Sequence, residues 1–151
     1  MTRTNLKRRQ LSLDFSSPGD HAELIHSGDR HGTVLFWERL ADDGKHWIKC
    51  KPTENLPAIA EQLRSKCDAY FTVNQFNGWR EVRLLKSLRA VYVDLDGQQD
   101  IELVLDALAA AQMPAPSLAV FSGRGLHLYW LLRATPGKAL PVWQRIQDAI
   151  L

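Results

Sequence analysis

Short apolar or alternating segments, each bounded by turn residues, recur along the chain. Two of them, 33–40 and 46–51, are rich in Val, Trp, Phe and Ile and flank an Asp43-Gly44 pair. An Asp-Gly pair between two such runs is typical of a β-hairpin. Further strands are predicted at 69–74, 90–95, 118–121 and 126–132.

Helical periodicity marks other segments. In 56–67, the apolar residues Leu56, Ile59 and Leu63 recur every three or four positions, which is the spacing of one helix face. The remaining predicted helices are 20–26, 79–88, 101–112 and one that begins near Leu140. The chain thus mixes crossover and hairpin connections, which favours an α+β sheet with helices on one face over a purely parallel α/β sheet.

The chain length and composition suit one domain. It has 151 residues, of which 45% are hydrophobic and 24% charged. We expect a basic N-terminal arm over 1–19, broken at Pro18, and a single domain over 20–151. No apolar run approaches the roughly 18 residues of a membrane span, and the N-terminus lacks the apolar core of a secretory signal. We therefore expect a cytoplasmic protein with no membrane partner.

The net charge and the two cysteines exclude few functions. The net charge is +2, so nucleic acid binding would need a local basic surface. Candidate surfaces are the arginines and lysines of the N-terminal arm and a second cluster: Arg80, Arg83, Lys86 and Arg89. Cys50 and Cys67 lack the close spacing of zinc ligands, and we interpret them as small core residues.

The segment VYVDLDG carries the first candidate chemistry. Asp94 and Asp96 are two positions apart at the end of a predicted strand, so their carboxylates project from the same face. Two neighbouring like charges are unfavourable unless a cation neutralises them. A hard divalent cation suits carboxylate and phosphate oxygens. A solvated strand end before a Gly97 turn is the alternative.

The segment FSGRGLHLYW carries the second group of candidate functional residues. Its Ser-Gly-Arg-Gly turn exposes backbone N–H groups that can bind a phosphate oxygen, and Arg124 can add a charge-assisted contact. His127 follows on a strand whose opposite face is wholly apolar. Because it lies roughly thirty residues after Asp96, with one helix and one strand between them, the two strands can be neighbours in one sheet.

Together, these two segments resemble the archaeo-eukaryotic primase (AEP) superfamily, and most of all the primase-polymerase-type domains of plasmid, phage and mobile-element replication proteins. The resemblance covers about 70–143 well. It implies an RRM-like mixed or antiparallel sheet with flanking helices, preceded by a small α/β module. It also implies a nucleotidyltransferase that uses Mg²⁺ or Mn²⁺, a DNA template and an NTP or dNTP, with a fused or separate replicative helicase as a further partner.

The resemblance assigns roles residue by residue. Asp94 and Asp96 match the metal-binding acids, and His127 matches the residue that contacts the triphosphate. The nucleotide-binding turn consists of Ser122, Gly123, Arg124 and Gly125. Arg80 and Arg83 are candidate DNA contacts.

One part of the family pattern is not found. A third acidic residue on a later strand completes the metal site of the family, whereas the only acid after His127 is Asp148, in a predicted helix. We therefore expect a domain that ends before its third acidic motif, with weak nucleotide or metal binding and little or no polymerisation by these residues alone.

Two other readings remain open. A haloacid dehalogenase-type phosphatase begins with a similar DxDG motif, but Gln98 replaces its usual Thr or Val and few residues follow. A non-catalytic DNA-binding replication module would instead use Trp79, Phe76 and Tyr70 to stack on bases. Metal-dependent nucleotide binding would distinguish the nucleotidyltransferase from this module.

Overall fold

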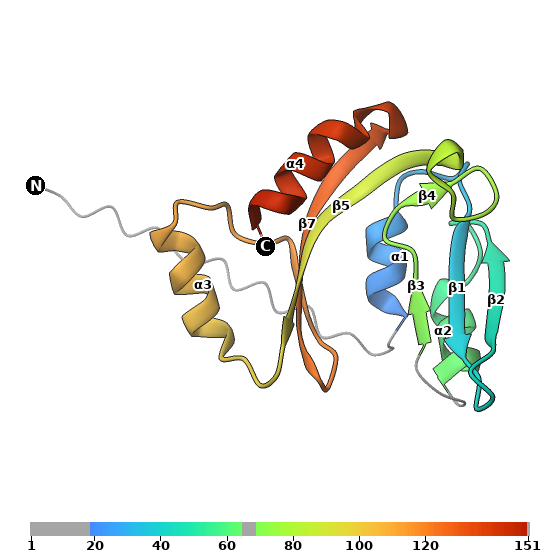
Figure 1. Cartoon of the computed structure of the whole chain (residues 1–151), viewed down its shortest axis with the longest axis horizontal. Helices are drawn as coiled ribbons and strands as arrows, with labels where there is room; N and C mark the ends of the chain where they lie inside the picture. The colour runs from blue at the N-terminus through green and yellow to red at the C-terminus, as the bar shows by residue number, and fades with distance from the viewer. Residues whose placement is uncertain (1–18, 65–68, 151) are drawn as a thin grey trace, which may run out of the picture.

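The computed structural model describes residues 19–64 and 69–150 and contains two antiparallel sheets. Figure 1 shows the two sheets with α1 between them. The first sheet has three strands in the order β2-β1-β3, and the second has four in the order β4-β5-β7-β6. The expected α+β class with an antiparallel sheet, preceded by a small α/β module, is confirmed.

The first module contains the predicted hairpin. Its elements are α1 (Asp20–His26), β1 (Val34–Arg39), β2 (Lys45–Cys50), α2 (Leu56–Arg64) and β3 (Ala69–Phe71). The β1–β2 turn places Asp43 at a φ of 61°, a conformation that Asp adopts more readily than most residues. The hairpin register pairs Trp37 with Trp47.

The second module contains the larger sheet. Its elements are β4 (Gln75–Phe76), the short 3₁₀ helix η1 (Val82–Leu84), β5 (Leu85–Asp96), α3 (Ile101–Ala110), β6 (Leu118–Phe121), β7 (Gly125–Pro136), the 3₁₀ helix η2 (Gly137–Ala139) and α4 (Leu140–Ile150). The long strands β5 and β7 pair along most of their length and form the centre of the sheet.

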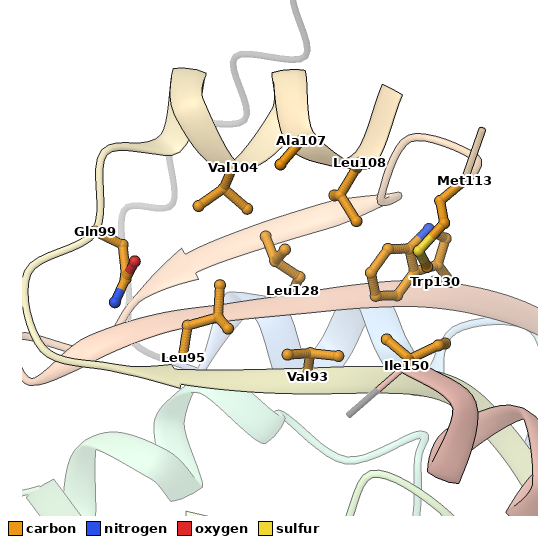
Figure 2. Close-up of a pocket in the computed structure, with 10 residues that line it drawn as sticks. All are labelled: Val93, Leu95, Gln99, Val104, Ala107, Leu108, Met113, Leu128, Trp130 and Ile150. Atoms are coloured by element: carbon orange, nitrogen blue, oxygen red, sulfur yellow. The ribbon is translucent and has the colours of Figure 1, made fainter. Parts of the chain in front are cut away.

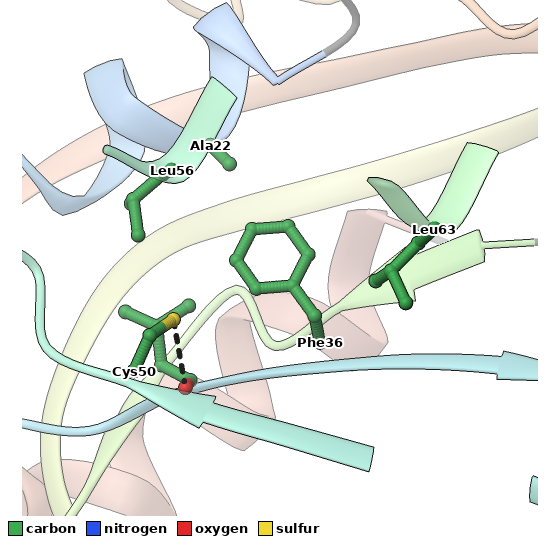
Figure 3. Packing of buried hydrophobic residues seen from close by; sticks show 6 residues of the cluster. Ala22, Phe36, Cys50, Leu56 and Leu63 are labelled. Carbon is green, nitrogen blue, oxygen red and sulfur yellow. Dashed lines mark hydrogen bonds between the residues drawn. The ribbon is translucent and has the colours of Figure 1, made fainter. Parts of the chain in front are cut away.

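Helix α1 connects the two cores. Ala22 packs with Phe36, Leu56 and other residues of the first module, as Figure 3 shows. Ile25 packs against Ala90 and the neighbouring residues of the second sheet. These two side chains are three residues apart and lie close together on the helix surface, so this short helix packs against both modules. Phe71, which packs against both cores, also joins the two modules.

Arg89 secures the end of this helix. Its guanidinium donates to the carbonyl oxygens of Ile25 and Ser27, and its backbone N–H donates to Oδ1 of Asn74. The strand pairing of β5 with β7 shifts register beside Arg89, which reorients the side chain away from the regular alternation. This residue therefore holds a carbonyl-rich helix end rather than a ligand.

Helix α3 lies on the opposite face of the second sheet from α1, so the helices do not share one face as predicted, and no residue of α3 is buried. An apolar cavity of about 340 Å³ lies between that helix, the sheet and the end of α4. Figure 2 shows that Val104 and Leu108 of α3 point toward Val93 and Leu128 of the sheet across this space. No helix in the described part of the chain is both long and apolar enough to span a bilayer.

The structure corrects two element predictions. Residues 79–88 do not form a helix, because η1 is followed directly by the start of β5 at Leu85. The leucines there have helical spacing, but pairing with β4 and β7 outweighs local propensity. The predicted strand 69–74 ends at Phe71, and the short strand β4, which was not predicted, follows at Gln75–Phe76.

Candidate functional site

Asp94 and His127 are register partners on β5 and β7, and their side chains are in contact. Nε2 of His127 lies 3.0 Å from Oδ1 of Asp94. Both groups remain accessible, because the Asp94 side chain is 61% exposed and the His127 side chain 32%. The structure thus brings together an acid and an imidazole that the sequence predicted to converge.

Asp96 lies one step further along the strands, opposite Gly125. It is exposed and, by the alternation of β5, projects from the same face as Asp94. The chain then turns at Gly97, where φ is 79°, and the Gly97 N–H donates to the carbonyl oxygen of Arg124 at 2.9 Å. This hydrogen bond joins the turn that follows the aspartates to the turn that precedes the imidazole.

The turn before β7 is stabilised by its own serine. Oγ of Ser122 accepts from the N–H groups of Arg124 at 3.4 Å and Gly125 at 3.1 Å. Gly123 has a φ of 83°, which glycine adopts at little cost. Two N–H groups that could bind a phosphate oxygen are therefore engaged within the turn, and a phosphate reaches them only by displacing the Ser122 hydroxyl.

Behind the imidazole, the same sheet face becomes core. The ring of Tyr129 lies 6.5 Å from that of His127 and is 4% exposed. Burial, followed by the nearby Tyr92 and Asp94, raises the pKa of the Tyr129 hydroxyl above its usual range. Tyr129 packs with Ile25 of α1. The candidate site therefore lies at the rim of the core that joins the two modules.

A solved structure has a similar fold. A cyanophage S-2L primase-polymerase AEP domain superposes with a TM-score of 0.61 over 87% of this chain and 69% of the cyanophage chain, at 18% sequence identity. The chain has the fold of an AEP primase domain. The predicted family resemblance is thereby confirmed at the level of the fold.

A second similarity of this primase-like domain comes from sequence. A replication protein of Clostridium perfringens is 32% identical over 87 residues, which cover 52% of this chain and 21% of that protein. The matched part thus spans about a fifth of the length of this relative. No family model matches the chain.

The donor set of the primase-like domain suits a divalent cation only in part. Two exposed carboxylates share one sheet face with an imidazole, and carboxylate oxygens are the ligands that suit Mg²⁺ or Mn²⁺. Within residues 19–64 and 69–150, however, no three or more His, Cys, Asp and Glu side chains are grouped closely enough to hold a metal ion. To hold such an ion, Asp94 and Asp96 would have to rearrange or be joined by a further ligand.

The predicted basic cluster does not form one surface in the primase-like domain. Lys86 is 3.3 Å from Oδ1 of Asp29, and Arg89 is buried at the end of α1. Arg83 is exposed but lies 2.6 Å from Glu81. Arg80 is exposed. The basic residues of the N-terminal arm and Cys67 lie outside the described residues.

The aromatic residues also divide differently from the prediction. Phe76 is 7% exposed and belongs to the core, whereas Tyr70 and Trp79 are 41% and 46% exposed. Trp37 and Trp47, which were interpreted only as strand residues, stack on each other beside them. The hairpin register contained this signal, because it aligns the two tryptophans across adjacent strands. Cys50 is buried as expected, and burial raises the pKa of its thiol to about 12.

Proposed function

We propose that this domain is the nucleotidyltransferase core of a primase or primase-polymerase that acts in the replication of a plasmid, phage or mobile element. The observation that carries the proposal is the contact between His127 and Asp94 at the accessible end of two paired central strands. The AEP fold and the similarity to a replication protein support it. The partners would be a DNA template, an NTP or dNTP and a replicative helicase.

Asp94 and Asp96 would hold Mg²⁺ or Mn²⁺. Such an ion neutralises charge on the triphosphate and on the leaving pyrophosphate. Asp94 is already within hydrogen-bonding distance of an imidazole, so it must exchange that partner or share its second oxygen when a cation binds. Asp96 is exposed and has room to approach the same ion.

His127 and the turn before it would hold the triphosphate. The His127 imidazole can donate to a phosphate oxygen once Asp94 turns toward a cation, and Arg124 supplies a positive charge from the adjacent turn. Ser122 would position this turn, because its hydroxyl organises the backbone N–H groups of Arg124 and Gly125. Arg80 and Arg83 are proposed DNA contacts.

The reaction is nucleotidyl transfer. A 3′-hydroxyl oxygen attacks the α-phosphorus of the bound nucleotide, the bond from that phosphorus to the bridging oxygen of the pyrophosphate breaks, and the hydroxyl proton leaves to solvent. The residues of this site form no covalent bond to the substrate. They contribute by holding the triphosphate in line with the hydroxyl and by placing positive charge where negative charge develops.

Metal-dependent nucleotide binding tests the proposal. The affinity of the purified chain for a fluorescent nucleoside triphosphate would be measured by anisotropy in Mn²⁺ and again in EDTA. We expect binding in Mn²⁺ that EDTA abolishes. We also expect Asp94→Asn and Asp96→Asn to weaken binding at least tenfold, whereas Glu61→Gln, which removes an exposed carboxylate on α2, should not. Binding that is equal in Mn²⁺ and EDTA contradicts the proposal.

A further inference from the structure

A row of aromatic rings crosses the three-stranded sheet of the first module. Trp37 on β1 is the register partner of Trp47 on β2 and of Tyr70 on β3. The ring centroids of Trp37 and Tyr70 lie 4.3 Å apart at 14°, and those of Trp37 and Trp47 lie 5.7 Å apart at 30°. Trp79 continues the row, with its centroid 6.5 Å from that of Trp47 and its ring nearly perpendicular.

Cations accompany these rings. Nζ of Lys45 lies 5.1 Å from the centroid of Trp37, and Nζ of Lys49 lies 4.4 Å from that of Trp79. Both lysines are exposed, and both lie on β2 two positions from Trp47, so they share its face. The row therefore presents π surfaces and positive charge together, with the charged groups close to the rings.

The core does not require these rings. The opposite face of the same sheet carries Phe36, which is 2% exposed and packs against α1 and α2. The two ends of the aromatic row, in contrast, are the exposed rings of Tyr70 and Trp79, at 41% and 46%. A contiguous aromatic surface of this kind on a small domain marks an interaction site rather than a packing need.

We infer that this aromatic row, made of Trp37, Trp47, Tyr70 and Trp79 with Lys45 and Lys49, binds single-stranded DNA. Unpaired bases have free faces that can stack on the exposed rings, and the lysines can contact the phosphates between them. A duplex has its base faces already stacked inside, so it cannot use the rings in this way. The charge complements a polyanion, and the nearby acid Glu81 is already paired with Arg83.

This surface is separate from the nucleotide site and does not depend on the proposed nucleotidyl transfer. The aromatic row lies on the face of its sheet that points away from α1, because residue 36 packs toward α1 and residue 37 points the opposite way. Asp94 and His127 lie on the other sheet, on the face against which α1 packs. DNA binding at the row can therefore be measured without metal or nucleotide.

The test is a binding titration of the whole chain with a fluorescently labelled oligothymidylate, at low salt and in EDTA. Fluorescence anisotropy measures the fraction of oligonucleotide bound. Tyr70→Leu and Trp79→Leu remove an exposed ring and keep an apolar side chain. We expect each to weaken binding about tenfold. Lys49→Gln should weaken binding. It should also make the negative slope of log affinity against log salt concentration shallower by about 0.7, as the loss of one phosphate contact predicts.

Matched controls come from elsewhere on the surface. Phe121→Leu removes a ring that is 62% exposed on β6, and Lys138→Gln removes an exposed charge on η2. Both should bind as the unmodified chain does. The inference is overturned if the unmodified chain does not bind the oligonucleotide, or binds a duplex of the same length equally well. It is also overturned if Tyr70→Leu and Trp79→Leu, shown by circular dichroism to be folded, bind normally.

Discussion

The backbone of Gly125 passes so close to that of Leu95 that a Cβ atom on the glycine would lie 2.2 Å from the Leu95 carbonyl oxygen. The contact occurs where β5 and β7 pair and the two motifs meet. Backbone atoms on a central strand cannot move aside cheaply. We expect Gly125→Ala to lower the free energy of unfolding by about 3 kcal/mol, the upper range for overpacking, as measured by urea denaturation.

Gly123 provides the matched control in the same turn. A Cβ atom there would meet nothing within 4 Å, although φ is 83°. Gly123→Ala should therefore cost only the conformational penalty of about 1 kcal/mol. Gly125 does not have a positive φ, so equal destabilisation by the two substitutions would contradict the idea that the close approach to Leu95 makes glycine necessary at position 125.

His127 should matter for ligand binding much more than for stability. Its contact with Asp94 is between partly exposed groups, and such pairs contribute less than about 1 kcal/mol. We predict that His127→Asn leaves the urea midpoint nearly unchanged and reduces Mn²⁺-dependent triphosphate affinity about tenfold, because one charge-assisted hydrogen bond is lost. His31→Asn, at an exposed position, is the control. Unchanged affinity in His127→Asn would remove the imidazole from the proposed site.

The buried imidazole of His26 makes stability depend on pH. Burial lowers its pKa from 6.5 to about 4, even though a hydrogen bond to the Thr72 carbonyl opposes the shift. In the unfolded chain the imidazole is protonated below about pH 6.5, whereas in the folded chain it is protonated only below about pH 4. The stabilisation is therefore present above pH 6.5 and lost as the pH falls to 4, by about 3 kcal/mol in total.

Urea denaturation at several pH values checks this loss against His26→Gln, which cannot titrate. The pKa of Asp29 is also lowered, but from 3.8, so its contribution is lost at lower pH than this window. The stability of the variant should decline less between pH 6.5 and 4 than that of the unmodified chain. Parallel declines would assign the pH dependence to other groups.

Local patterns in the sequence predicted most of the fold. The helix 20–26 has the predicted bounds, and the Asp43-Gly44 pair marks the hairpin turn. The prediction was wrong at 79–88, where β5 gains hydrogen-bonded partners on both sides: β4, which is near in sequence, and the end of β7, which is distant. Local periodicity contains no information about such partners.

The candidate site shows the same division. The pairing of Asp94 with His127 followed from strand alternation and the short connection between two neighbouring strands, and the structure places them in contact. The sequence did not predict that Lys86 and Arg89 are engaged within the protein. Their partners, Asp29 and the end of α1, come from the first module. Tyr70 and Trp79 were predicted as stacking residues, but the row that they form with Trp37 and Trp47 was not, because it requires a strand register and a third strand as well as a hairpin.

Gln147 of α4 protects the edge of β5. Its amide accepts from the Tyr92 N–H at 3.2 Å and donates to the Tyr92 carbonyl oxygen, so it replaces a neighbouring strand. The side chain of Trp143 does the same for the Ala90 carbonyl oxygen at 2.9 Å. Gln147→Leu should therefore leave two backbone groups without partners and lower the free energy of unfolding by about 2 kcal/mol. Hydrogen exchange at the Tyr92 amide should accelerate as well.

Gln144→Leu is the matched control, because it changes an exposed glutamine one turn earlier whose amide donates only to Asp148 of the same helix at 2.8 Å. It should change stability by less than about 0.5 kcal/mol. If Gln147→Leu proves equally mild, or if exchange at Tyr92 stays slow, α4 covers this edge by apolar packing alone. The two hydrogen bonds of the Gln147 amide would then be unnecessary for stability. The rest of α4 would be enough to protect the edge of β5 beside the candidate site.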